Sequence, residues 1–244
     1  MQGPTIAFGE EWSGYIGHSD QSAPHTHVAI QVCIGLESNV TVQIGARLLQ
    51  APVIIIAPFV EHRAIAGAGR VAYLYVYPDA GLGRSLVRLL GEEDFIATQS
   101  GLLGELVSQP SLEAAVKVLV EQVVTQEPMD DRLARALGAL RNDWSGQGAV
   151  SRAASVAGIS GPRLRVLARS QMGVPLSQWI VWRKLERACR SLAEGADLTQ
   201  AAMDGMFSDQ AHFTRMMQRM MGISPARAVC VMRDASETFK TTFP

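Results

Sequence analysis

Residues 150–173 read VSRAASVAGISGPRLRVLARSQMG, and this stretch decides the fold of the C-terminal half. It predicts a short helix, a turn at Gly158 and a second helix capped by Ser160, because serine caps favour helix starts. A short helix, a glycine-containing turn and a second helix with basic outward residues are typical of a helix-turn-helix motif, although a helical hairpin with a solvated face shares the pattern. Four outward side chains are the candidates for DNA contact: Arg163, Arg165, Val166 and Arg169.

A second unit of the same kind follows at residues 197–221. Asp197 and Gln200 have the spacing of a capping box, a turn is expected over residues 205–207, and Ser208 is expected to cap the next helix. A stripe of Phe and Met at helical spacing would face inward: Phe213, Met216, Met217 and Met220. The side chains that can read base edges or hold phosphates lie opposite or at the helix start: Ser208, Gln210, Ala211, Thr214, Arg215 and Gln218.

One longer helix is expected between the two units, from Pro175 to about Glu194. Twenty helical residues span about 30 Å. Successive major-groove segments on one face of DNA lie ~34 Å apart. The spacing therefore predicts that one chain can place two recognition helices in adjacent turns of the groove.

The N-terminal half has the pattern of short strands. Apolar or alternating runs at residues 27–35, 40–44, 53–57 and 71–77 are separated by Gly and Pro, which favours a β-sandwich or small barrel. Helical patterns follow at residues 82–90, 92–107 and 112–123. The expected domains are 1–80 (a β-barrel sensor), 81–128 (a helical dimerisation segment or linker) and 129–244 (the DNA-binding domain).

Charge is divided unevenly between the halves. Residues 1–129 carry 6 Lys+Arg and 13 Asp+Glu, whereas residues 130–244 carry 16 and 10, within a total of −1. The basic half is suited to an anionic partner, while near-neutrality argues against a simple polybasic coat for nucleic acid or membrane. Three widely spaced cysteines, no secretory signal and no spanning apolar stretch predict a cytoplasmic protein without a disulfide framework.

Residues 150–230 resemble the DNA-binding domain of AraC/XylS-family transcription regulators. The matching fragments are ASVAGIS at 154–160, GVP at 173–175, KLERA at 184–188, FSDQ at 207–210, HFTR at 212–215 and GISP at 222–225. The resemblance implies a bipartite domain whose two recognition helices contact adjacent major-groove segments. By position it implies that the readers are Pro162, Arg165 and Val166 in the first unit, and Gln210, Ala211 and Arg215 in the second.

The chain departs from the family pattern at four positions. Met206 stands where the second turn usually has glycine, with Gly205 one place earlier, and Lys184 replaces the usual arginine of the linker helix. Val181 and Trp182 occupy positions that are usually polar. These changes bear on recognition by the second unit rather than on the architecture.

A histidine pattern in the N-terminal half resembles the cupin arrangement His-x-His…Glu…His. It consists of His25, His27, Gln31 and His62, and glutamine occupies the place of the cupin glutamate. Because a neutral amide is a weak ligand, we expect no metal and no cofactor, but a small-molecule pocket near whose mouth the histidines lie. The candidate effector residues are His25, His27, His62 and Tyr75, with a purely structural role for the histidines as the alternative.

These observations predict a two-domain α+β protein, with a cupin-like β-barrel followed by helices and an all-α bipartite helix-turn-helix domain. The expected function is sequence-specific binding of operator DNA in transcription regulation without chemical turnover, controlled by a small-molecule effector or by dimerisation. RNA polymerase would be a further partner if the protein is an activator. A homodimer seam is expected on one helix face at Leu112, Val116, Leu119 and Val123, with packing inside the subunit as an equally simple alternative. Two alternatives stay open, a metal-dependent cupin enzyme with an appended helical domain and a protein-binding adaptor.

Overall fold

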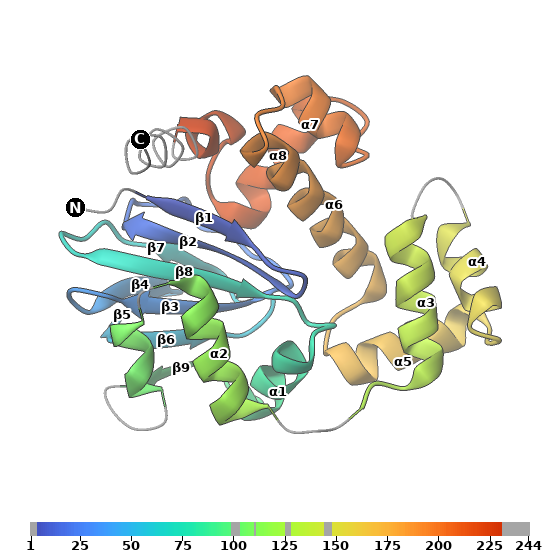
Figure 1. Ribbon diagram of the computed structural model, residues 1–244, viewed down its shortest axis with the longest axis horizontal. Helices are drawn as coiled ribbons and strands as arrows, with labels where there is room; N and C mark the ends of the chain where they lie inside the picture. Colours follow the sequence, from blue (N-terminus) through green and yellow to red (C-terminus); the bar gives the residue numbers. More distant parts are fainter. Residues whose placement is uncertain (1–3, 99–102, 110, 125–127, 144–147, 231–244) are drawn as a thin grey trace, which may run out of the picture.

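The computed structural model describes residues 4–98, 103–109, 111–124, 128–143 and 148–230 (Figure 1). Strands fill most of its first 80 residues, and every described element after residue 111 is a helix. None of the described helices is long and apolar enough to cross a membrane.

The strands form two antiparallel sheets rather than one continuous barrel wall. The larger sheet has the order β1 (Thr5–Phe8), β2 (Trp12–His18), β8 (Arg70–Val76), β3 (Ile30–Gly35), β6 (Val53–Ile56) and β9 (Phe95–Thr98). The smaller sheet has the order β5 (Arg47–Ala51), β4 (Val40–Ile44) and β7 (His62–Ala64). Alternate residues of both sheets share one apolar core, so the expected barrel takes the form of two facing sheets.

The prediction of a helix at residues 92–107 in the N-terminal half is wrong. Residues 92–107 contain strand β9 and a short 3₁₀ helix, Gly104–Ser108, instead of a longer α-helix. The strand pairs with β6, whose four residues are all buried. Backbone hydrogen bonding at the outer edge of that apolar strand outweighs the local helical pattern.

Two helices cover the other face of the larger sheet. These are α1 (Gly81–Leu90) and α2 (Leu112–Val123), as the sequence predicts. The expected dimer seam lies on α2 but does not face solvent, because Leu112 and Leu119 are fully buried and Val116 and Val123 pack against the same core. The stripe therefore stabilises this subunit, and its assignment as an exposed dimer seam is wrong.

The C-terminal half follows the predicted series of helices. It consists of α3 (Asp131–Asn142), α4 (Ala149–Val156), α5 (Gly161–Met172), α6 (Leu176–Ala193), α7 (Leu198–Asp204) and α8 (Gln210–Met221). A final helix begins at Pro225 after the cap Ser224 and is described as far as Cys230. The sequence pattern predicts a helix opened by Asp130 and Asp131 that runs to about Trp144; α3 ends at Asn142, and Trp144 lies outside the described residues.

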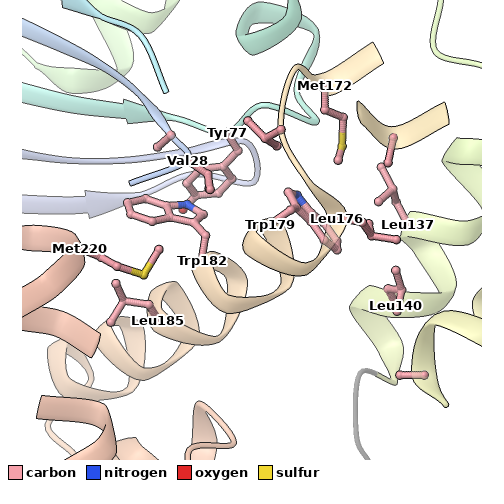
Figure 2. Packing of buried hydrophobic residues seen from close by; sticks show 14 of the residues in the cluster. Val28, Tyr77, Leu137, Leu140, Met172, Leu176, Trp179, Trp182, Leu185 and Met220 are labelled. Carbon is pink, nitrogen blue, oxygen red and sulfur yellow. The ribbon is translucent and has the colours of Figure 1, made fainter. Parts of the chain in front are cut away.

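The two halves share a hydrophobic core. Val28, Ala29 and Tyr77 of the sheet region belong to the same buried cluster as α3 to α8. Figure 2 shows Trp182 of α6 directed toward Val28 and Tyr77, while Trp179 one turn away lies among residues of the helical half. The helix that links the two helix-turn-helix units is thus also packed against the sheets.

Candidate functional site

The first helix-turn-helix unit presents the predicted side chains to solvent. Gly158 has φ +70°, and the Ser160 hydroxyl accepts a hydrogen bond from the Arg163 amide at 3.3 Å. Leu164, Leu167 and Ala168 are buried on the inner face of α5. The outer face consists of exposed residues: Arg163, Arg165, Val166 and Arg169, with Pro162 at the helix start.

The second unit presents a more polar surface. Ser208, Gln210, Ala211, Arg215 and Gln218 are exposed. Thr214 is half-buried, and its hydroxyl donates to the backbone oxygen of Gln210 at 2.9 Å. On the inner face Phe213, Met217 and Met220 are buried, with Met216 partly buried against them.

The cap of α8 differs from the prediction. Asp209 Oδ1 accepts from the His212 amide at 2.6 Å, so Asp209 is the N-cap. The Ser208 hydroxyl instead donates to Asp209 Oδ2 at 3.0 Å. An ionised carboxylate is a stronger acceptor for a helix N–H than a hydroxyl, which explains the one-residue shift.

In the turn between α7 and α8, close packing against α6 falls on Gly205 and the left-handed backbone conformation falls on Met206. Met206 takes the left-handed conformation, with φ +56°. A Cβ on Gly205 would meet Ala188 Cβ at 2.7 Å and Lys184 O at 2.8 Å. The glycine therefore permits close approach to α6, while a non-glycine residue takes the positive φ.

Helix α6 joins the units and has the predicted bounds within two residues. Its 18 residues correspond to a length of about 27 Å, and α5 and α8 lie near its opposite ends (Figure 1). Arg183 of this helix stacks over the Tyr77 ring at 4.7 Å, and Arg190 pairs with Glu186 at 2.8 Å.

The N-terminal half contacts the C-terminal ends of both candidate recognition helices, α8 through the sheet region and α5 through helix α1. At α8, the Ala23 amide donates to Gly222 O at 2.9 Å and the Thr26 amide donates to Arg219 O at 3.3 Å. At α5, a Cβ on Gly173 would lie 3.2 Å from a methyl of Val87 in α1. Both units are therefore in direct contact with the N-terminal half.

A largely apolar cavity of about 170 Å³ lies between the larger sheet and α6. Its lining includes Phe8, Tyr15, Tyr75, Trp182, Leu185 and Met221. Of the predicted effector residues, His25 and Tyr75 line it, whereas His27 and His62 do not. Arg227 and Asp20, which form an ion pair at 3.0 Å, also belong to its lining.

The three predicted histidines come together beside this cavity. His25, His27 and His62 are all buried, and one ring nitrogen of each lies within 4.8 Å of the others. Gln31 Oε1 lies 3.0 Å from His27 Nε2 and 2.7 Å from His62 Nε2. The sequence placed Gln31 in this set but gave no sign that one amide contacts two imidazoles.

Burial keeps these imidazoles neutral. It lowers the pKa of His27 to about 4, helped by the neighbouring His25, and lowers the pKa of His25 as well. Burial and the two other imidazoles lower the pKa of His62 to about 2. Desolvation penalises the charged form, and three close imidazoles penalise it further.

Sequence reasoning missed the contact between Trp182 and this cluster. The indole lies 5.3 Å from the His27 ring and 5.9 Å from the Tyr75 ring, between centroids. The sequence did contain a signal for this contact, because Trp182 stands at a position that is usually polar in the resembling family. A large apolar residue at such a position indicates a buried surface.

Comparison with known proteins agrees with this architecture. Residues 153–229 match the family described as "Helix-turn-helix domain", which is of the AraC type. The probable transcriptional regulator LumQ of Photobacterium leiognathi is 26% identical over 220 residues, 88% of this chain and 86% of LumQ.

Solved structures of ToxT from Vibrio cholerae have a similar fold. An apo variant has a TM-score of 0.61 at 10% identity, covering 92% of this chain and 98% of ToxT. ToxT bound to an unsaturated fatty acid has a TM-score of 0.57 at 11% identity, covering 93% and 98%. At these identities the likeness concerns the fold. Residues 153–229 therefore match an AraC-type helix-turn-helix domain, and over most of its length the chain is similar to a probable transcriptional regulator.

Proposed function

We propose that this protein regulates transcription by reading an operator through α5 and α8, with Arg165 and Arg215 as the main readers. The exposed faces of the two helices carry the proposal, because base-edge and phosphate contacts need exposed cationic and amide side chains. Arg163 and Arg169 flank Arg165 and would hold phosphates. Gln210 and Gln218 complete the second surface.

The experiment selects bound fragments of the source genome with the purified full-length chain and then measures affinity by fluorescence anisotropy. Affinity should fall steeply with salt, because phosphate contacts release counterions. Reading by both helices predicts two conserved half-sites about one helical turn apart. Binding that does not depend on salt, or a single contiguous half-site, contradicts this part of the proposal.

We further propose that the cavity beside α6 holds an apolar small-molecule effector. The cavity borders both the sheet region and α6, the helix that joins the two DNA-binding units. A ligand in the cavity would therefore act on the relative position of the two DNA-binding units. One ToxT structure contains an unsaturated fatty acid, which makes such acids the first compounds to test. A ligand bound only to the folded chain raises its melting temperature, and Cys189→Phe, which fills the cavity, should abolish the rise.

The proposal also covers the domain bounds, the cellular location and the partners of this protein. The domain bounds are 1–80, 81–128 and 129–244, although the shared core shows that the last is not packed independently of the first. A regulator of chromosomal genes acts in the cytoplasm. It would assemble as a homodimer, which light scattering can test, and contact RNA polymerase if it activates.

A further inference from the structure

We infer that Arg141, Arg183, Arg187 and Arg190 form a binding site for a compact anion that carries two or more phosphate groups. The site lies between α3, α6 and the turn that joins β1 to β2, and it is distinct from the apolar cavity, although Glu186 lines both. The inference goes beyond the proposed apolar effector. Only its consequence for DNA binding depends on the proposed function.

A cavity of about 430 Å³ opens between these three elements. Its lining has a net charge of +2 and consists of the four arginines with Gly9, Glu10 and Glu186. Asp79, which pairs with Arg141 at 2.5 Å, offsets one further charge, so the cavity stays cationic. No aromatic or aliphatic side chain belongs to this described lining, which therefore does not suit an acyl chain or a nucleobase.

The charge of Arg183 is only partly neutralised within the described structure. Its side chain is 12% exposed, and its Nε and Nη1 atoms are buried without a hydrogen-bond partner. The Glu186 carboxylate lies 3.7 Å from Arg183 Nη2 and is shared with Arg190, at 2.8 Å from Arg190 Nη2. Burying a cation without full pairing costs free energy, so an anion in the cavity would lower that cost.

Arg187 adds a guanidinium group that is exposed and takes part in no ion pair among the described residues. Arg183, Arg187 and Arg190 follow one another at helical spacing, so they lie along one face of α6. Arg141 of α3 completes the lining from a second helix. The guanidinium fork binds phosphate oxygens in pairs, and forks on two helices favour a ligand with more than one anionic group.

A second interpretation is that the arginines serve only to join the two halves of the chain. Arg141 pairs with Asp79 at 2.5 Å. Arg190 Nη2 donates to Gly9 O at 3.2 Å, and both partners belong to the N-terminal half. Arg187 takes part in no such contact among the described residues, so its substitution distinguishes the two interpretations.

The experiment titrates inorganic pyrophosphate into the full-length chain without Mg²⁺ and at fixed ionic strength, and follows the heat by calorimetry. We expect one equivalent to bind. Arg187→Ala should weaken binding roughly 10-fold or more, in the range of hydrogen bonds to charged groups. Arg135→Ala removes an exposed arginine of α3 outside the cavity lining, and this matched control should keep the parental affinity. Glu10→Gln removes a carboxylate from the lining and should tighten binding several-fold.

The inference is supported if Arg187→Ala binds more weakly, Arg135→Ala binds as the parent does and Glu10→Gln binds more tightly. Absence of binding by the parent chain, or parental binding by Arg187→Ala, overturns it in favour of arginines that only join the halves. An equal loss in Arg187→Ala and Arg135→Ala shows general attraction by the basic half and also overturns it. Citrate that binds as tightly as pyrophosphate overturns the assignment to phosphate.

A second measurement tests the consequence for DNA binding. A phosphate ligand would compete with Gly9 O for Arg190 and with Asp79 for Arg141, and so weaken contacts between the two halves. At matched ionic strength, pyrophosphate should therefore change the affinity of the parent chain for operator DNA but leave that of Arg187→Ala unchanged. Equal changes in both chains overturn this coupling. Failure of the chain to bind DNA would refute the proposed function, whereas the calorimetric titration would still decide the anion site.

Discussion

The indole of Trp182 lies against the imidazole of His27, with 5.3 Å between ring centroids. Trp182 belongs to the helix that links the two DNA-binding units, and His27 belongs to the sheet region. Trp182 is thus a direct buried contact between the histidine cluster and the linking helix. Together with the shared core and the backbone hydrogen bonds of Ala23 and Thr26, this contact joins the two halves.

Trp182 is expected to hold the halves together. Trp182→Ala should lower the free energy of unfolding by about 3–5 kcal/mol, because it removes a side chain that is 2% exposed and leaves a cavity. Trp182→Phe keeps the ring contact with His27 and should cost much less. Urea unfolding followed by circular dichroism measures both. A cost below 1 kcal/mol for the alanine variant, as for a surface position, would contradict the role.

Arg165 and Arg215 are expected to carry sequence discrimination. Replacing either by alanine should cost ~1–3 kcal/mol of preference for the operator over unrelated DNA. Arg47→Ala, which removes an exposed arginine of the sheet region, is the matched control and should change nothing. Anisotropy titrations with the selected operator and a scrambled duplex give the ratio. If both variants keep the parental ratio, the assignment of readers is wrong.

The sequence predicted the helical half closely and the sheet half less well. Caps such as Ser160 and Asp197 are local signals, so the helix starts could be placed within a residue or two. Strands β1, β2, β5, β7 and β9 were not anticipated, because their pairing is decided by distant partners. The exposed faces of α5 and α8 could be predicted from helical periodicity, but the contacts of Gln31 and Trp182 join segments far apart in the chain.

Substitution should lower the free energy of unfolding at Gly205 but leave it unchanged or raise it slightly at the neighbouring Met206. Gly205→Ala places a Cβ 2.8 Å from Lys184 O and should destabilise the chain by about 1–3 kcal/mol, in the range of overpacked cores. Met206→Gly relieves a left-handed conformation that costs about 1–2 kcal/mol, partly offset by the greater entropy of unfolded glycine. We expect Met206→Gly to be neutral or slightly stabilising in urea unfolding. A strongly destabilised Met206→Gly would show that its side chain matters more than its backbone.

Asp209 should make the start of α8 sensitive to acid. The His212 amide and the Ser208 hydroxyl donate to its carboxylate and lower its pKa. A carboxyl group whose pKa is lower in the folded chain contributes stability above its unfolded pKa of about 3.9, and this contribution is lost as pH falls through the folded value. Asp209→Asn, which keeps a capping oxygen without the charge, should therefore be less stable than the parent at pH 7 and approach it in acid. Ser208→Ala should reduce the pH dependence by a smaller amount, because it removes only one of the two hydrogen bonds that lower the pKa of Asp209. Thermal unfolding of the three chains between pH 7 and pH 3 makes the comparison, and a constant difference between parent and Asp209→Asn would contradict the assignment of Asp209 as a charged cap.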